Sequence, residues 1–186
     1  MTAPHPDQPP GQLIVLSGPP GAGKSTVARL LTDSLTPSVH LHSDDFWHNI
    51  KQGWIAPYLP ESEHQNSVVV HAAAAAAGIY ASGGYQVIYD GVVGPWFIDV
   101  FREAAAQHGV ALHYVILRPD LATTVNRAIH RTGDALTEPE PIRALHNQFT
   151  DLGSYESHVL DPSHLPPQAT ADAVAELLHS GKAILQ

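Results

Sequence analysis

Residues 18–25 read Gly-Pro-Pro-Gly-Ala-Gly-Lys-Ser, which matches the phosphate-binding pattern G-x-x-x-x-G-K-[ST]. The pattern is meaningful where a buried strand precedes it and a helix follows it. Both are expected here, because residues 13–16 form a short apolar run and residues 25–35 carry apolar side chains at helical spacing. This context favours a phosphate-binding loop over a flexible connection rich in glycine and proline.

The residue types in this loop predict how it would hold a nucleotide. Its glycines let backbone N–H groups point at phosphate oxygens, Lys24 would reach the β- and γ-phosphates, and the Ser25 hydroxyl would bind Mg²⁺. The N-terminus of the following helix also favours an anion. The predicted nucleotide-binding residues of the loop are Gly18, Pro19, Pro20, Gly21, Ala22, Gly23, Lys24, Ser25 and Thr26.

Composition limits the classes of function. The 186 residues suffice for one domain, and the sequence contains no cysteine, which excludes disulfides and thiolate metal sites. A formal net charge of −9 disfavours nucleic acid and anionic membrane surfaces as partners. The apolar residues 68–81 are too few to span a bilayer.

The beginning of the chain differs in composition from the rest. Residues 1–11 are polar and proline-rich without the features of a signal peptide, so we expect a disordered tail followed by one domain over residues 12–186. A cytoplasmic protein is the default expectation.

Strand and helix patterns alternate along the domain, which predicts an α/β fold with a mostly parallel sheet. The expected strands are residues 13–16, 39–41, 85–89, 111–117 and 158–160. The expected helices are residues 25–35, 60–81, 95–108, 120–131, 140–152 and 170–178.

Three carboxylates follow predicted strands, at the sheet edge where ligands bind in such folds. Asp44 and Asp45 follow the second strand, and Asp90 follows the third. One of the first two would orient or deprotonate an attacking hydroxyl while the other caps the turn, and Asp90 would hold the metal or the substrate. The alternative for Asp90 is an ordinary turn residue before Gly91.

Four arginines fall in one segment: Arg118, Arg127, Arg131 and Arg143. Arg127 and Arg131 are four residues apart on a predicted helix and precede a polar loop, residues 132–141. They would form a movable arm that closes over ATP and stabilises transition-state charge, or else an ordinary solvated helix face.

Other side chains leave their roles open. His40 and His42 share one side of a strand, but no spacing matches a known metal motif, so a metal site there is disfavoured. Trp47, Trp54 and Trp96 flank the carboxylates in the sequence and would either line a substrate pocket or belong to the core.

With these residues in view, the chain resembles the small P-loop kinases of the chloramphenicol phosphotransferase, zeta toxin, gluconate kinase and polynucleotide kinase group, within the P-loop NTPase superfamily of AAA-type ATP-binding proteins. The phosphate loop, residues 43–46 (Ser-Asp-Asp-Phe) and the segment 115–131 carry the resemblance, which covers residues 13–178. It implies a three-layer fold, a five-stranded parallel sheet of order 2-3-1-4-5 and a lid segment.

The resemblance also implies roles for single residues. Asp44 corresponds to the catalytic carboxylate, Arg127 would stack near the adenine, and Arg131 would contact phosphates. The predicted catalytic residues are therefore Asp44, Lys24 and Arg131; the predicted metal ligands are Ser25 and Asp90; the predicted substrate residues are Asp44, Asp45, Trp47 and Asp90.

These observations predict transfer of the ATP γ-phosphate, with Mg²⁺, to a hydroxyl of a small molecule, either a sugar-like metabolite or an antibiotic. Between Arg29 and Arg102 the only cation is Lys51, which favours a neutral or cationic acceptor over an anionic one. The alternatives are a nucleotide-dependent switch without an acceptor, or a nucleotide or polynucleotide kinase. A monomer and a homodimer are both compatible with the sequence.

Overall fold

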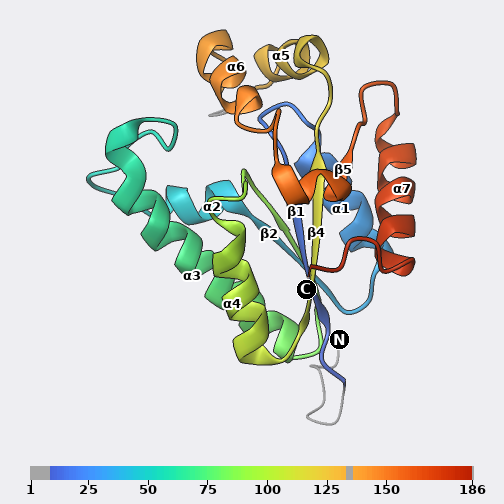
Figure 1. The fold of residues 1–186 in the computed structure, drawn as a ribbon. Helices are drawn as coiled ribbons and strands as arrows, with labels where there is room; N and C mark the ends of the chain where they lie inside the picture. The colour runs from blue at the N-terminus through green and yellow to red at the C-terminus, as the bar shows by residue number, and fades with distance from the viewer. Residues whose placement is uncertain (1–8, 133–135, 186) are drawn as a thin grey trace.

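The computed structural model describes residues 9–132 and 136–185, and within them an all-parallel sheet of five strands runs in the order β2-β3-β1-β4-β5 (Figure 1). The strands are β1 (Gln12–Ser17), β2 (Ser38–His42), β3 (Gln86–Asp90), β4 (Ala111–Leu117) and β5 (Val159–Leu160). The predicted fold class and strand order are both confirmed.

Helices cover both faces of the sheet. The helices are α1 (Lys24–Ser34), α2 (Ser43–His48), α3 (Glu63–Ser82), α4 (Ile98–His108), α5 (Leu121–Ile129), α6 (Pro139–Asn147) and α7 (Pro167–His179), with short 3-10 turns at Pro60–Ser62 and Gly153–His158. Figure 1 shows α3 and α4 against one face and α1 and α7 against the other, while α5 and α6 lie beyond one end of the sheet. Each face has its own apolar core, which gives three layers.

The burial of the strands follows their place in the sheet. β1, β3 and β4 are central and apolar along almost their whole length, as expected for strands covered on both faces. β2 lies at an edge and is only half-buried. The buried face of α3 consists largely of small residues, and Ala73, Ala77 and Gly78 allow close packing of α3 against its neighbours. A Cβ at Gly78 would lie 2.5 Å from the His108 ring of α4.

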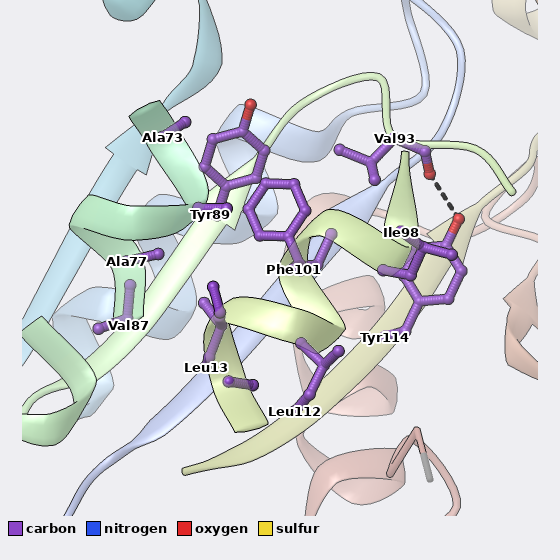
Figure 2. Packing of buried hydrophobic residues seen from close by; sticks show 14 of the residues in the cluster. Leu13, Ala73, Ala77, Val87, Tyr89, Val93, Ile98, Phe101, Leu112 and Tyr114 are labelled. Carbon is purple, nitrogen blue, oxygen red and sulfur yellow. Dashed lines mark hydrogen bonds between the residues drawn. The ribbon is translucent and has the colours of Figure 1, made fainter. Parts of the chain in front are cut away.

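One core cluster holds the loop that follows β3. Figure 2 shows the Phe101 ring against Tyr89, with ring centroids 4.7 Å apart, and the Tyr114 hydroxyl donating to the Val93 carbonyl. The buried Ser17 hydroxyl also donates to the Val93 carbonyl (2.6 Å) and accepts from the Val93 N–H (3.0 Å). The loop after Asp90 is therefore fixed to β1 and β4, next to the phosphate loop.

The structure differs from the sequence-based expectation at several boundaries. α2 occupies a segment expected to be irregular, and α4 begins three residues after Pro95 because residues 95–97 form a turn in which the N–H of Phe97 bonds to Gly94 O (3.0 Å). The expected helix over residues 140–152 ends at Asn147.

The beginning of the described chain is partly packed against the domain. Most of the expected N-terminal tail, residues 1–8, lies outside the described residues. Gly11 is buried, and its N–H donates to Ala81 O at 2.8 Å, so the packed domain begins at this residue. In the part of the chain that the structure describes, no helix combines the length and apolarity needed to cross a membrane.

Truncation of Phe101 tests the packing under α4. Phe101 is fully buried, so Phe101→Ala is expected to lower the free energy of unfolding by about 3–5 kcal/mol through lost contacts and a cavity. Ile79→Ala on the exposed face of α3 is the control and should change it by no more than about 0.5 kcal/mol. Urea denaturation measures both; equal losses would show that this core does not stabilise the fold.

Candidate active site

The phosphate loop connects β1 to α1 with a backbone that requires glycine. Gly18 and Gly21 have φ angles of 139° and 83°. A Cβ at Gly18 would lie 2.1 Å from Leu117 O, and one at Gly21 would lie 2.4 Å from Thr124 O. The loop is therefore pressed against the end of β4 on one side and against α5 on the other, so that larger residues at either position would displace it.

Lys24 is the first residue of α1, and its ammonium turns back over the loop. Its Nζ donates to Gly18 O at 2.8 Å and to Pro19 O at 3.0 Å. Enclosure by the loop lowers the pKa of Lys24 to about 8; Asp90 and Asp44 oppose this change, while Arg131 adds to it. Asp44 and Arg131, the other two residues predicted to be catalytic, thus both act electrostatically on Lys24.

Asp90 ends β3 and is almost completely buried, with 1 % of its surface exposed. Its carboxylate accepts from the Ser25 hydroxyl at 2.5 Å and contacts His40 Nε2 at 2.7 Å. Burial alone would raise the pKa of Asp90, but these two hydrogen bonds and the nearby His42 hold it below its usual value. An ionised, buried carboxylate bonded to the phosphate loop is not an ordinary turn residue.

The two predicted metal ligands, Ser25 and Asp90, therefore contact each other. Hydroxyl and carboxylate oxygens are the donors that Mg²⁺ prefers, and Mg²⁺ typically takes only one or two protein ligands when it also binds phosphates. Among the described residues, no group of three or more His, Cys, Asp or Glu side chains is arranged to hold a metal by itself. The pair fits a metal shared with a nucleotide.

Asp44 and Asp45 occupy the first turn of α2, and neither is its N-cap, which is His42. Asp44 lines a cavity of about 850 Å³ that also includes the phosphate loop, whereas Asp45 does not line it and has 77 % of its side chain exposed. The Asp44 carboxylate lies 3.9 Å from His42 Nε2. The expected division into one capping and one chemical aspartate is thus replaced by one aspartate that lines the cavity, with 54 % of its side chain exposed, and one that lies outside the cavity.

Only two of the four clustered arginines line the cavity. Arg127, near the end of α5, donates to Pro162 O (3.2 Å) and Ser163 O (3.3 Å), and Arg131 follows that helix. The Asp120 carboxylate caps α5 by accepting from Thr123 N at 2.7 Å, which sets where the helix begins.

The other two arginines have different surroundings. Arg118 forms a two-pronged ion pair with Glu156 (2.8 and 2.9 Å), and Arg143 is exposed on α6 outside this cavity. The expected polar loop, residues 132–141, includes residues 133–135, which lie outside the described residues.

One cavity of about 850 Å³ joins these groups. It is bounded by the phosphate loop, α2, residues 54–58, the loop after β3 and the segments around α5 and α6. All three tryptophans of the sequence line it, and Trp47 also packs against the core. Of the predicted nucleotide-binding loop residues, Gly18 and Pro19 lie behind the cavity lining and contribute carbonyls to Lys24.

Sequence reasoning missed His40 and Asn66. His40 was given no role, yet it bonds to the buried carboxylate at the centre of the site. Asn66 on α3 lines the cavity and accepts from Trp47 Nε1 at 3.0 Å. The signal for His40 was its position two residues before the end of a strand adjacent to β3; no sequence pattern indicated Asn66.

Solved structures share this fold across nearly the whole chain. A sugar kinase from Janibacter sp. HTCC2649 is 20 % identical with a TM-score of 0.67, covering 91 % of this chain and 95 % of that one. The APS kinase CysC of Mycobacterium tuberculosis in complex with AMPPNP and APS is 19 % identical, with a TM-score of 0.65 and coverage of 92 % and 99 %. The tunicamycin resistance protein of Deinococcus radiodurans is 17 % identical, with a TM-score of 0.64 and coverage of 90 % and 95 %.

No curated protein matches the sequence significantly. The family model AAA_33, described as an AAA domain, matches residues 13–151. This range contains the phosphate loop, the three candidate aspartates (Asp44, Asp45 and Asp90) and the arginine segment. Because that match spans most of the chain, and because the fold is that of the small P-loop kinases, the protein belongs to this AAA domain family of P-loop proteins.

Proposed function

We propose that the protein is an ATP- and Mg²⁺-dependent phosphotransferase that moves the γ-phosphoryl group to a hydroxyl of a small molecule, either a sugar-like metabolite or an antibiotic. The observation that carries this proposal is a single cavity bounded by the phosphate loop, the Ser25–Asp90 oxygen pair and the Asp44 carboxylate. Phosphoryl transfer requires these parts and little else. Similarity in fold to a sugar kinase and an APS kinase supports the same class of reaction.

The loop and the arginines would bind the nucleotide. Backbone N–H groups of residues 21–25, Lys24 and Arg131 would hold the phosphates, where cations offset the spreading negative charge. Arg127, bonded to the carbonyls of Pro162 and Ser163, would contact the base side. A phosphate beside Lys24 would favour its charged form and oppose the lowering of its pKa by burial.

Ser25 and Asp90 would hold Mg²⁺, and His40 would orient the Asp90 carboxylate through its hydrogen bond. When bound, Mg²⁺ supplies positive charge that neutralises oxygens of the β- and γ-phosphates. The low pKa of Asp90 keeps the carboxylate ionised at neutral pH, as a metal ligand must be.

Asp44 would orient the acceptor hydroxyl and take its proton. The acceptor oxygen forms a bond to the γ-phosphorus while the bond from that phosphorus to the bridging oxygen breaks, and ADP leaves with the electron pair. Lys24 and Arg131 would stabilise the charge that develops on the transferred group.

Removal of the loop ammonium tests nucleotide chemistry. Lys24→Ala should lower the rate of ADP formation in the presence of an acceptor by about 10²–10³-fold, because a charge aimed at the transferred phosphate is lost. Lys182→Ala, at an exposed position near the C-terminus, is the matched control and should leave the rate unchanged. A coupled assay for ADP measures both rates, and a near-normal rate for Lys24→Ala would refute the assigned role.

The neighbouring aspartates provide an internal comparison for the acceptor carboxylate. Asp44→Asn should reduce transfer by about 10²–10⁴-fold, the usual contribution of a general base, while ATP affinity stays within a few-fold. Asp45→Asn, one residue further on the exposed side of α2, should change the rate by a few-fold at most. Steady-state transfer rates and calorimetric ATP affinities are measured for both variants. Transfer that survives in Asp44→Asn but not in Asp45→Asn would assign the role of general base to Asp45 instead of Asp44.

A further inference from the structure

Part of the cavity lining consists of large aromatic side chains that stay partly exposed. Trp54, Tyr58 and Trp96 are exposed by 52 %, 42 % and 44 %, and with Trp47 they form what we call the aromatic wall. Exposed apolar side chains gathered in a concave site indicate a surface that a ligand covers. The wall shares this cavity with Asp44 and with the loop that would bind phosphate.

Hydrogen bonds hold the Trp47 ring, and the backbone between Trp54 and Tyr58, in place before any ligand binds. Gln65 of α3 pairs with both backbone groups of Ile55, accepting from its N–H (2.8 Å) and donating to its carbonyl (2.7 Å). The Asn66 amide donates to Pro57 O at 2.7 Å and accepts from Trp47 Nε1 at 3.0 Å. A preformed surface loses little conformational freedom on binding.

Two of the rings are fixed so that they offer apolar faces rather than polar groups. The indole N–H of Trp47 is already bonded to Asn66 and is therefore not free to donate to a ligand. The Trp96 ring packs edge-on against Phe149, with centroids 5.6 Å apart. Flat aromatic faces bind flat apolar faces of other rings, aromatic or pyranose.

The charges around the wall disfavour an anion. Among the described residues that line the cavity, the lysine and arginine side chains are Lys24, Arg127 and Arg131, which belong to the phosphate loop and the α5 segment. Lys51 lies in the segment that carries the wall, but it is exposed and donates to His48 O outside the lining. An anionic group at the wall would be desolvated without a lysine or arginine from the segments that carry the wall. The histidines of the lining are His42, whose Nε2 lies 3.9 Å from the Asp44 carboxylate, and His48.

We propose that the aromatic wall binds the phosphate acceptor, and that this acceptor is a ring-bearing alcohol without an anionic group. The proposal rests on the proposed function, because only a phosphotransferase makes the bound molecule a phosphate acceptor. It goes beyond that function by separating uncharged ring alcohols from sugar acids, nucleotides and other phosphorylated compounds, which share hydroxyl groups but carry negative charge.

A matched pair of glycosides tests the proposal by binding alone. Phenyl β-D-glucoside and phenyl β-D-glucuronide share both rings and differ in a CH₂OH group against a carboxylate. Calorimetric titration in saturating Mg²⁺ and AMPPNP, whose γ-phosphate is not transferred, should give the glucoside an affinity about tenfold higher, the cost of burying an unpaired charge. Because all three tryptophans line the cavity, the glucoside should also change the tryptophan fluorescence of the wild-type protein.

Two single substitutions test whether the glucoside binds at the wall rather than at another exposed aromatic side chain. Trp54→Ala should weaken glucoside binding about tenfold through lost ring contact. Tyr80→Ala is the control, since Tyr80 is a half-exposed aromatic on α3 outside the cavity, and it should not alter binding. Equal or tighter glucuronide binding, absence of glucoside binding, or equal effects of the two variants would each overturn the proposal.

A transfer assay with ATP in place of AMPPNP, run beside the titration, distinguishes failure of this inference from failure of the proposed function. Glucoside binding at the wall with no phosphate transfer from ATP to any bound ring alcohol would reject the phosphotransferase and keep the binding class. Transfer of phosphate to an anionic acceptor would keep the phosphotransferase and reject the binding class.

Discussion

The buried carboxylate of Asp90 joins three segments that are far apart in the sequence. It ends β3, accepts from Ser25 at the start of α1, and bonds to His40 on β2. A charge buried to this degree is tolerated only when it is hydrogen-bonded, and the two bonds also lower its pKa. The phosphate loop, β3 and the edge strand β2 are therefore fixed relative to one another at one carboxylate, and the rest of the site is built outward from it.

The site combines two kinds of chemistry in one cavity. Lys24, Arg127 and Arg131 gather positive charge around a loop whose glycines are pressed against neighbouring carbonyls. The same cavity also holds Asp44, which acts electrostatically on Lys24, and all three tryptophans; among the described lining residues, none of the segments that carry the tryptophans contributes a lysine or arginine. The polyanionic donor and an uncharged acceptor would thus be sorted by electrostatics before any specific contact is made.

Local features were predictable from the sequence, and long-range ones were not. The phosphate loop, the strands around it and the carboxylates at strand ends follow from short patterns, and the fold class follows from their alternation. The strand order came from family resemblance, because spacing does not determine which strands pair. α2 was missed because six residues are too few to show a helical period, and without α2 the roles of Asp44 and Asp45 could not be separated.

The remaining differences between the sequence-based expectations and the structure arise from strand register and from contacts between residues that are far apart in the sequence. In the parallel pairing of β2 with β3, His42 lies opposite Asp90. His40, two residues earlier on β2, points to the same side of the sheet as His42 and reaches the Asp90 carboxylate. The sequence does not give this alignment between strands. Arg118 looked like its arginine neighbours, but its partner Glu156 lies 38 residues away in the chain. The sequence left the tryptophans between core and substrate pocket. All three line the cavity, and Trp47 also packs against the core. For Trp54, the deciding feature is the position of residues 54–58 against α3, which no sequence pattern indicates.

The measurement that tests the central claim most directly is phosphorus NMR of the protein with ATP, Mg²⁺ and pooled uncharged ring alcohols. Transfer to an acceptor predicts a new phosphomonoester resonance that grows in step with ADP. Growth of inorganic phosphate alone, in step with ADP, would contradict the account and identify a nucleotide hydrolase or switch without an acceptor.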